Sequence, residues 1–311
     1  MRIAIVGTGG VGALVGGLLA RGGSEVAFVA RGANLSALRD RGLSVNSPRG
    51  TFRLDRVEVT DDPAILAPAD VVLVAVKGWQ VREVAPRLTP LLAREGFAVP
   101  LENGVEAADD LAEALGEHRV AGGLCHMLAW LEAPGVVRHV GELLRVTVGE
   151  RHGGGSARLD RLVDTLGAAG IDAVVADDIS AALWEKFLFI SSFGGVGAVT
   201  RSPVGAFRAV PESRALLVSA MEEVAALARA RGIRLAPDAV DRALATLDRL
   251  PADATASMQR DIQAGRPSEL GDQTGAVMRL ARESSVPVPA HAFILASLLP
   301  QEQAARHSDS R

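Results

Sequence analysis

The chain of 311 residues has little cysteine and little net charge. The single cysteine, Cys125, excludes an intrachain disulfide and a cysteine-rich zinc site, and the histidines lack metal-ligand spacing, so we expect no resident metal. Basic residues are scattered and the net charge is −4, which argues against a nucleic-acid partner. No apolar run reaches the roughly 18 residues of a membrane span. With no evident signal peptide, we expect a cytoplasmic protein with no membrane partner.

The length of the chain and a change in its hydrophobic pattern predict two domains. Hydrophobic residues make up 48% of the chain, as in globular proteins, and the length suits domains of roughly 100–200 residues. Residues 1–176 alternate apolar strand-like runs with helical patterns, which predicts an α/β, doubly wound sheet of the Rossmann type. Residues 177–311 have helical periods punctuated by glycine and proline, which predicts an all-α domain. We expect the polar tail from about residue 301 to be frayed.

The predicted elements of the first domain follow one another closely. Runs such as 71–76 are apolar at every residue, as in parallel strands covered on both faces. Strands are predicted at 2–6, 25–30, 70–77 and 97–103, and helices at 9–22, 34–42 and 79–92.

The first strand runs into a glycine loop, Gly7-Thr8-Gly9-Gly10-Val11-Gly12, at the start of a helix. This G-x-G-x-x-G pattern in a strand–loop–helix context is the dinucleotide-binding fingerprint. The first glycine makes the turn, the second lets the pyrophosphate approach, and the helix N-terminus attracts the anion. A purely structural glycine turn is the alternative.

The second strand ends in "FVARG", with Arg31 and no acid where NAD-binding folds usually place one. A guanidinium at this point suits a ribose 2′-phosphate, because it can form paired hydrogen bonds. We therefore expect NADP(H); an ordinary surface arginine is the alternative.

Three polar residues stand out among apolar neighbours. Lys77 and Asn103 each end a predicted strand, where ligands bind in open α/β sheets, although a solvated lysine and an Asn-Gly turn are ordinary readings. Lys186 lies in the largely apolar run "LWEKFLFISSFGGVGA". A lysine in a core-facing helix needs a partner or a route to water.

These pieces resemble the ketopantoate reductase family (2-dehydropantoate 2-reductases). The matching segments are "GTGGVG", "VARG", "VAVKGWQ", "LENG", "LWEKFLF" and "SMQRDIQAGRPSEL", in family order along nearly the whole chain. The resemblance implies a Rossmann domain and a helical domain, with the active site in the cleft between them. It implies NADPH as hydride donor, a small 2-oxo acid as substrate, and a place in pantothenate biosynthesis.

The resemblance also assigns roles to individual residues. It makes Lys186 the catalytic lysine and proton donor, and it places Lys77 and Asn103 near the nicotinamide ribose and the substrate. Ser257 helps to hold the substrate carboxylate, and Glu269 contacts the cofactor or substrate near the reacting hydroxyl. We expect Glu269 to be the charge partner of Lys186; a first-turn acid favourable to a helix dipole is the alternative for Glu269.

Three positions depart from the family pattern. The family has substrate-binding asparagines after the lysine, and an ungapped reading puts Ile190, Gly194 and Val204 there. None of these side chains can hydrogen-bond, so the pocket is less polar and has extra room at Gly194.

Three hypotheses stay open at this point. The first is reduction of 2-dehydropantoate to pantoate. The second is a related reductase or dehydrogenase that acts on a more apolar 2-oxo acid or ketone. The third is a non-catalytic NADP(H) sensor, which would not need a proton donor. A homodimer through the apolar helical domain is an option that the sequence does not decide.

Overall fold

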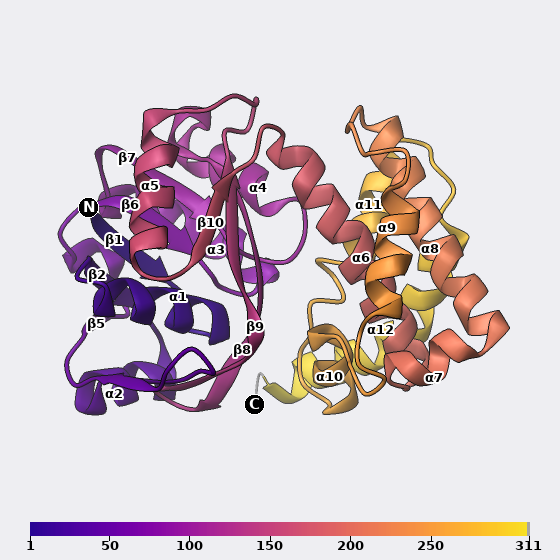
Figure 1. The fold of residues 1–311 in the computed structure, drawn as a ribbon, viewed down its shortest axis with the longest axis horizontal. Coiled ribbons are helices and arrows are strands. Elements are labelled where there is room, and N and C mark those ends of the chain that lie inside the picture. The colour runs from indigo at the N-terminus through magenta and orange to yellow at the C-terminus, as the bar shows by residue number, and fades with distance from the viewer. Residues whose placement is uncertain (310–311) are drawn as a thin grey trace. The chain divides into compact units, whose positions relative to one another are not determined.

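The computed structural model describes residues 1–309, which divide into two compact units (Figure 1). The first unit comprises Met1–Glu102 and Ala107–Ile179. The second comprises Asn103–Glu106 and residues 180–309. The expected fold class, an α/β domain followed by a helical domain, is confirmed. The short segment Asn103–Glu106, however, groups with the helical unit although it directly follows the last strand of the parallel sheet.

The first unit is built on a five-stranded parallel sheet of order β5-β2-β1-β6-β7. Its strands are β1 (Arg2–Val6), β2 (Glu25–Val29), β5 (Glu58–Thr60), β6 (Ala69–Val74) and β7 (Leu92–Pro100). The strand order reverses beside β1, because β2 flanks it on one side and β6 on the other. Ligands of such sheets bind beyond the carboxyl ends of the strands at this switch point.

Strand β1 shows why the strands are apolar at consecutive residues. Ile3 and Ile5 pack on one face with α1 (Gly10–Arg21), while Ala4 and Val6 pack on the other with α4 (Ala107–Leu115). All four side chains are at most 2% exposed. The sheet is covered on both faces, as the runs without alternation predict.

A second sheet in this unit was not predicted. Its path is β10-β9-β3-β4, and β8 pairs antiparallel with β9 (Figure 1). Its strands are β3 (Leu43–Asn46), β4 (Phe52–Leu54), β8 (Gly122–Ala133), β9 (Val136–Gly149) and β10 (Asp172–Val175). Many side chains of the β8–β9 hairpin are exposed, so it lacks the continuous apolar signature of the parallel strands. Helices α2 (Gly32–Arg41) and α5 (Ala157–Ala168) complete the unit.

The prediction of one α-helix over 79–92 is wrong. The segment forms one α-helical turn, α3 (Val81–Val84), between two 3₁₀ stretches, Gly78–Gln80 and Ala85–Leu91. Pro86 and Pro90 lie in the second stretch, and a proline has no amide hydrogen for the helical ladder.

The second unit is helical throughout residues 180–309 except for its connections. Its helices are α6 (Ile179–Thr200), α7 (Val204–Ala209), α8 (Pro211–Ala230), α9 (Ala239–Asp248), α10 (Ser257–Gln263), α11 (Thr274–Glu283) and α12 (Pro289–Asp309). Helix α6 supplies much of the core, since Phe187, Leu188 and Val196 are fully buried. Helix α8 packs against α11 and α12.

The polar tail expected to fray from residue 301 instead continues α12 to Asp309. Glu302, only 5% exposed, accepts hydrogen bonds from the backbone N and the hydroxyl of Ser268. It also pairs with Arg306, N to O 2.7 Å. These contacts tie the last turns to the core, an effect that composition does not reveal; residues 310–311 lie outside the described residues.

Candidate functional site

The glycine loop lies at the carboxyl end of β1, at the switch point of the parallel sheet. Gly7 has a φ of +95°, and a Cβ there would lie 2.6 Å from the carbonyl oxygen of Ala75. Gly9, by contrast, has no heavy atom within 4 Å of its would-be Cβ, and it immediately precedes α1. The loop is therefore closed against protein at Gly7 and open at Gly9, where a phosphate group can approach the N-terminus of α1. This geometry fits a dinucleotide.

Asn34 on α2 holds the loop from the side. Its amide nitrogen donates to the carbonyl oxygen of Thr8 at 2.8 Å and to the Thr8 hydroxyl at 2.5 Å. Its amide oxygen accepts from the backbone N of Gly135 at 2.7 Å, in the turn of the β8–β9 hairpin. Sequence reasoning missed Asn34, because its partners are 26 and 101 residues away along the chain.

Arg31 occupies the position before α2, at the end of β2. Its side chain is 48% exposed and pairs with Glu83, Nη1 to Oε1 3.0 Å. The sequence shows no acid beside Arg31, but α3 brings one to it in space. The guanidinium retains donors beyond the one that Glu83 engages, at a helix N-terminus that also favours anions.

Lys77 follows β6 and its backbone N donates to the side chain of Gln80 at 3.2 Å. Its ammonium lies 5.8 Å from the centre of the Trp79 ring. Nearby, Glu102 is 6% exposed and accepts from the backbone N of Val76. Lys77 thus lies in the first unit, three residues beyond the end of β6 rather than within the strand predicted over 70–77.

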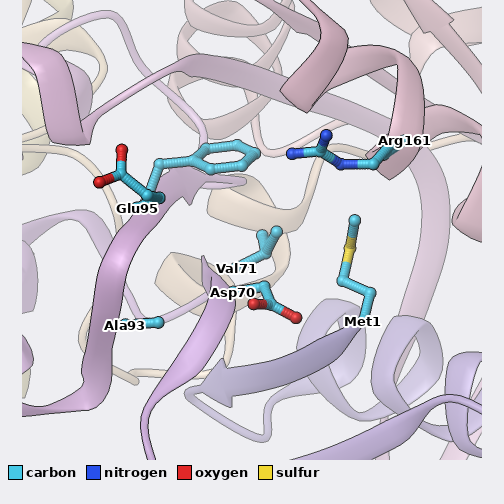
Figure 2. A pocket seen from close by; sticks show the side chains of 7 residues that line it. Met1, Asp70, Val71, Ala93, Glu95 and Arg161 are labelled. Carbon is cyan, nitrogen blue, oxygen red and sulfur yellow. The ribbon is translucent and has the colours of Figure 1, made fainter.

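A separate pocket of about 330 Å³ lies at the opposite, amino-terminal edge of the parallel sheet. Figure 2 shows Met1, Asp70, Glu95 and Arg161 among its lining side chains. Asp70 is engaged by the backbone N of Arg2. No predicted site residue lines this pocket, so it is not the candidate site.

The lysine of α6 is half-buried and unpaired. Lys186 makes no hydrogen bond or ion pair with any of the described residues 1–309. Its neighbour Glu185 turns away and pairs with Arg242 of α9. The expected ion pair between Lys186 and Glu269 is absent from the part of the chain that the structure describes.

Glu269 instead pairs with Asn103. The Asn103 amide donates to the Glu269 carboxylate at 3.2 Å, across 166 residues of sequence. Glu269 is 5% exposed and Asn103 is half-buried. The segment Asn103–Glu106 is further tied to the helical unit by an ion pair of Glu106 with Arg279 at 2.6 Å. Two predicted site residues are therefore in direct contact.

The other predicted substrate positions lie on neighbouring elements of the helical unit. Ser257 is the exposed first residue of α10. Ile190 and Gly194 follow Lys186 on α6 at intervals of four residues, so the three share a face. Val204 is fully buried at the start of α7 and belongs to the core. Its side chain packs with the helices and offers a ligand nothing polar.

Two further searches cover residues 1–309. No group of three or more His, Cys, Asp or Glu side chains there is placed to hold a metal ion. None of the helices in that range is long and apolar enough to cross a membrane.

Comparison with known proteins gives one consistent result. The family profile "Ketopantoate reductase PanE/ApbA" matches residues 3–153, and the profile of the C-terminal domain of the same family matches residues 178–302. The chain belongs to the ketopantoate reductase family.

Individual relatives span the whole chain. A 2-dehydropantoate 2-reductase of Halobacterium salinarum is 31% identical, over 93% of this chain and 95% of its own. A PanE/ApbA family ketopantoate reductase of Ralstonia eutropha has 29% identity and a TM-score of 0.90, covering 99% of this chain and 100% of its own. A D-mandelate dehydrogenase structure with NADH and anilino(oxo)acetate has a TM-score of 0.90 but 20% identity, which shows the shared fold alone.

Sequence reasoning did not single out one ionisable group of this member of the ketopantoate reductase family, the carboxyl of Asp272. Burial, and after it the nearby carboxylate of Glu269, raise the pKa of Asp272 to about 6 against the opposing charge of Arg279. One carboxylate oxygen of Asp272 is buried without a hydrogen bond. Its spacing of three residues from Glu269 is the one signal in the sequence that could have suggested the coupling.

The raised pKa of Asp272 predicts a pH-dependent stability. Between pH 3.8 and about 6 the carboxyl of Asp272 keeps its proton in the folded protein but loses it in the unfolded chain. The free energy of unfolding therefore falls as the pH rises through this range and stays lower above it. Asp272→Asn should therefore stabilise the protein by about 1–3 kcal/mol at pH 8 and by much less at pH 4.5. Urea unfolding of both proteins at both pH values measures this.

The exposed Asp253 provides the control, since Asp253→Asn should change the unfolding free energy by less than about 0.5 kcal/mol at either pH. An Asp272→Asn effect that is equal at pH 4.5 and pH 8 contradicts the assignment.

Proposed function

We propose that this protein reduces a 2-oxo acid to a 2-hydroxy acid with NADPH, nominally 2-dehydropantoate to pantoate, and that Lys186 supplies the proton. The observation that carries the proposal is the unpaired, half-buried ammonium of Lys186 on α6 in a member of an oxidoreductase family. Bound NADPH supplies the hydride. Lys186 stabilises the negative charge that develops on the ketone oxygen and donates a proton to it.

The scarcity of lysine supports a chemical role for Lys186. The chain has 33 basic residues, and all are arginine except Lys77 and Lys186. Arginine supplies positive charge equally well, but its guanidinium does not give up a proton at neutral pH. A lysine kept in a chain that otherwise uses arginine favours proton transfer over simple charge stabilisation.

In the proposal, Asn103 and Glu269 supply further polar groups of the active site, without a direct bond to Lys186. The Glu269 carboxylate engages one N–H of the Asn103 amide, which fixes the orientation of the amide. The amide then has one N–H and its oxygen left for the ribose or the substrate. Glu269 acts through Asn103, and Ser257 at the open start of α10 is our candidate for the substrate carboxylate.

The choice of NADPH over NADH rests on Arg31. Its guanidinium lies at the end of β2, where the ribose 2′-position is expected, and Glu83 holds it there. A 2′-phosphate would gain charge-assisted hydrogen bonds from Arg31 and a favourable helix terminus from α2.

A second candidate keeps the reaction and changes the substrate. The extra room expected at Gly194 is absent, because a Cβ there would already lie 3.2 Å from the Met258 methyl group and 3.5 Å from the Ala256 Cβ. The side chains at this place are apolar, and the preceding turn of α6 carries Ile190. These favour a 2-oxo acid with an apolar chain. The D-mandelate dehydrogenase neighbour, whose structure holds anilino(oxo)acetate, supports the idea that this fold accepts such ligands. Turnover of a panel of 2-oxo acids, followed by NADPH absorbance, decides between the two.

The role of Lys186 predicts a specific kinetic defect. Lys186→Ala should lower kcat by at least about 100-fold, because a general acid is lost, and leave the Kd for NADPH within about twofold. Lys186→Arg should be similarly slow, since it keeps the charge and loses the transferable proton. Stopped-flow measurement of NADPH oxidation gives kcat, and fluorescence titration gives the Kd.

The adjacent Glu185→Gln serves as control and should turn over normally, because Glu185 pairs with Arg242 on the surface. Normal kcat in Lys186→Ala would refute the assignment of the proton donor.

The cofactor assignment predicts a change in selectivity. Arg31→Asp should reduce the preference for NADPH over NADH in kcat/KM by about 10- to 100-fold, because an acid repels the 2′-phosphate and accepts from a 2′-hydroxyl. Arg39→Asp, on the exposed last turn of the same helix, should leave the ratio unchanged. An unchanged ratio in Arg31→Asp would remove the basis for NADPH.

A further inference from the structure

The residue before Glu269 is held by side chains rather than by a helix or a sheet. Ser268 lies in the connection between α10, which ends at Gln263, and α11, which begins at Thr274. It is fully buried and belongs to no helix or strand. The preceding residue, Pro267, has no amide hydrogen to donate. The backbone at Ser268 therefore needs hydrogen-bond partners from another part of the fold.

Those partners come from the last turns of α12. The carboxylate of Glu302 accepts from the Ser268 hydroxyl at 2.6 Å and from the Ser268 backbone N at 3.1 Å. The guanidinium of Arg306 donates to the Ser268 carbonyl oxygen at 3.0 Å, and its Nε lies 2.7 Å from the Glu302 carboxylate. Each polar group of Ser268 is thus bonded to one of these two side chains, which lie 34 and 38 residues further along the chain.

These bonds fix the direction in which the chain enters Glu269. A peptide group is planar, so a bond to the Ser268 carbonyl oxygen sets the plane that carries the backbone N and the Cα of Glu269. The bond to the Ser268 backbone N sets the preceding peptide plane in the same way. On the other side, the Glu269 carbonyl oxygen accepts from the backbone N of Asp272 at 3.1 Å and of Gln273 at 2.9 Å. The backbone of Glu269 is therefore held from both sides, and α12 holds one of them.

Arg306 also acts on the acidic groups of this turn through its charge. Burial, and after it the carboxylate of Glu269, raise the pKa of Asp272, and the charges of Arg279 and Arg306 oppose this rise. The positive charge of Arg306 therefore reaches the turn that contains Glu269, in addition to its contact with Glu302. Buried carboxylates such as Glu302 need donors of this kind, because an unpaired buried charge is costly.

We propose that Glu302 and Arg306 are positioning residues for the proposed reaction. Acting through Ser268, they hold the Glu269 carboxylate against the Asn103 amide. A Glu269 carboxylate that moved away would release this amide, which would then no longer present its free N–H and its oxygen to a ligand in one fixed orientation. The inference rests on the proposed function, because it takes Asn103 and Glu269 to belong to the active site.

The side-chain amide of Asn103 reports this effect directly. The chain has three asparagines, Asn34, Asn46 and Asn103, and each side-chain amide donates a hydrogen bond. Asparagine labelled with ¹⁵N in its side chain therefore gives three pairs of amide signals in an NMR spectrum. Glu302→Gln leaves one acceptor oxygen for three donors. It should shift the Asn103 signals toward their positions in Glu269→Ala and leave the other two pairs in place.

Turnover of the 2-oxo acid gives a second readout. Glu302→Gln should lower kcat/KM by about 5- to 20-fold, chiefly through kcat, because misplaced active-site groups slow the reaction. The Kd for NADPH should stay within about twofold. Ser268→Ala removes the hydroxyl contact alone and should cause a smaller loss of the same kind. Because both substitutions weaken one contact, the double variant should be at most about twofold slower than Glu302→Gln.

Glu223 provides a matched control, since it is another buried carboxylate that binds backbone amides. It accepts from the backbone N of Ala290 at 2.6 Å and of His291 at 3.0 Å, at the opposite end of α12. Glu223→Gln should lower the urea midpoint of unfolding, as Glu302→Gln also should. Unlike Glu302→Gln, it should leave kcat within about twofold and the Asn103 signals in place.

Two results would overturn the proposal. One is a folded Glu302→Gln protein with unchanged Asn103 signals or unchanged kcat/KM, and the other is an equal loss of turnover in Glu223→Gln. If Glu302→Gln does not fold, the Asn103 signals of Ser268→Ala decide in its place. Failure of the proposed function looks different, because the wild type then reduces no 2-oxo acid. The Asn103 signals still test the positioning in that case, since their shift in Glu302→Gln needs no turnover.

Discussion

The half-buried ammonium of Lys186 is the interaction on which the account of function depends. Helix α6 forms the core of its unit, so the position of this lysine is set by fully buried neighbours such as Phe187 and Leu188. A cation on such a rigid element, without an internal partner in residues 1–309, keeps its charge available to a ligand. Glu185, the preceding residue, pairs with Arg242 at the surface, so Lys186 is the charged side chain of this stretch that the proposed reaction can use.

The polar groups that the proposal combines with this lysine come from segments that are distant in sequence. Asn103 follows the last strand of the parallel sheet but belongs to the helical unit, where Glu269 fixes its amide. Glu269 in turn lies beside the protonatable Asp272, and Gln273 follows directly. The stretch from Glu269 to Gln273 thus combines an acid that orients an amide and a carboxyl with a raised pKa, one oxygen of which is buried without a hydrogen bond. This concentration of unsatisfied or perturbed groups is typical of functional sites.

The sequence predicts the fold class and the position of the glycine loop well because both have local signatures. Apolar runs without alternation identify the parallel strands, and the glycine spacing identifies the loop at the end of β1. The β8–β9 hairpin escaped prediction because exposed side chains interrupt its apolar pattern. The 79–92 segment was predicted wrongly because two prolines turn a helical pattern into 3₁₀ stretches. The tail from 301 stays helical through Asp309 owing to Glu302, whose partner Ser268 is 34 residues away.

The candidate site was also predicted only in part, because motifs identify residues and not their contacts. Lys77, Asn103, Lys186, Ser257 and Glu269 could be named from motifs, but their contacts could not. Glu269 was expected to face Lys186 and instead bonds to Asn103. Asn34 and Asp272 carry no motif and stand out only through their hydrogen-bond partners or their burial. The deciding measurement is the fate of the hydride. With NADPH deuterated at C4 and 2-dehydropantoate or another 2-oxo acid, the account predicts deuterium at C2 of the 2-hydroxy acid product, detected by mass spectrometry. Tight NADPH binding with no labelled product from any 2-oxo acid would contradict it and identify a non-catalytic NADP(H) sensor.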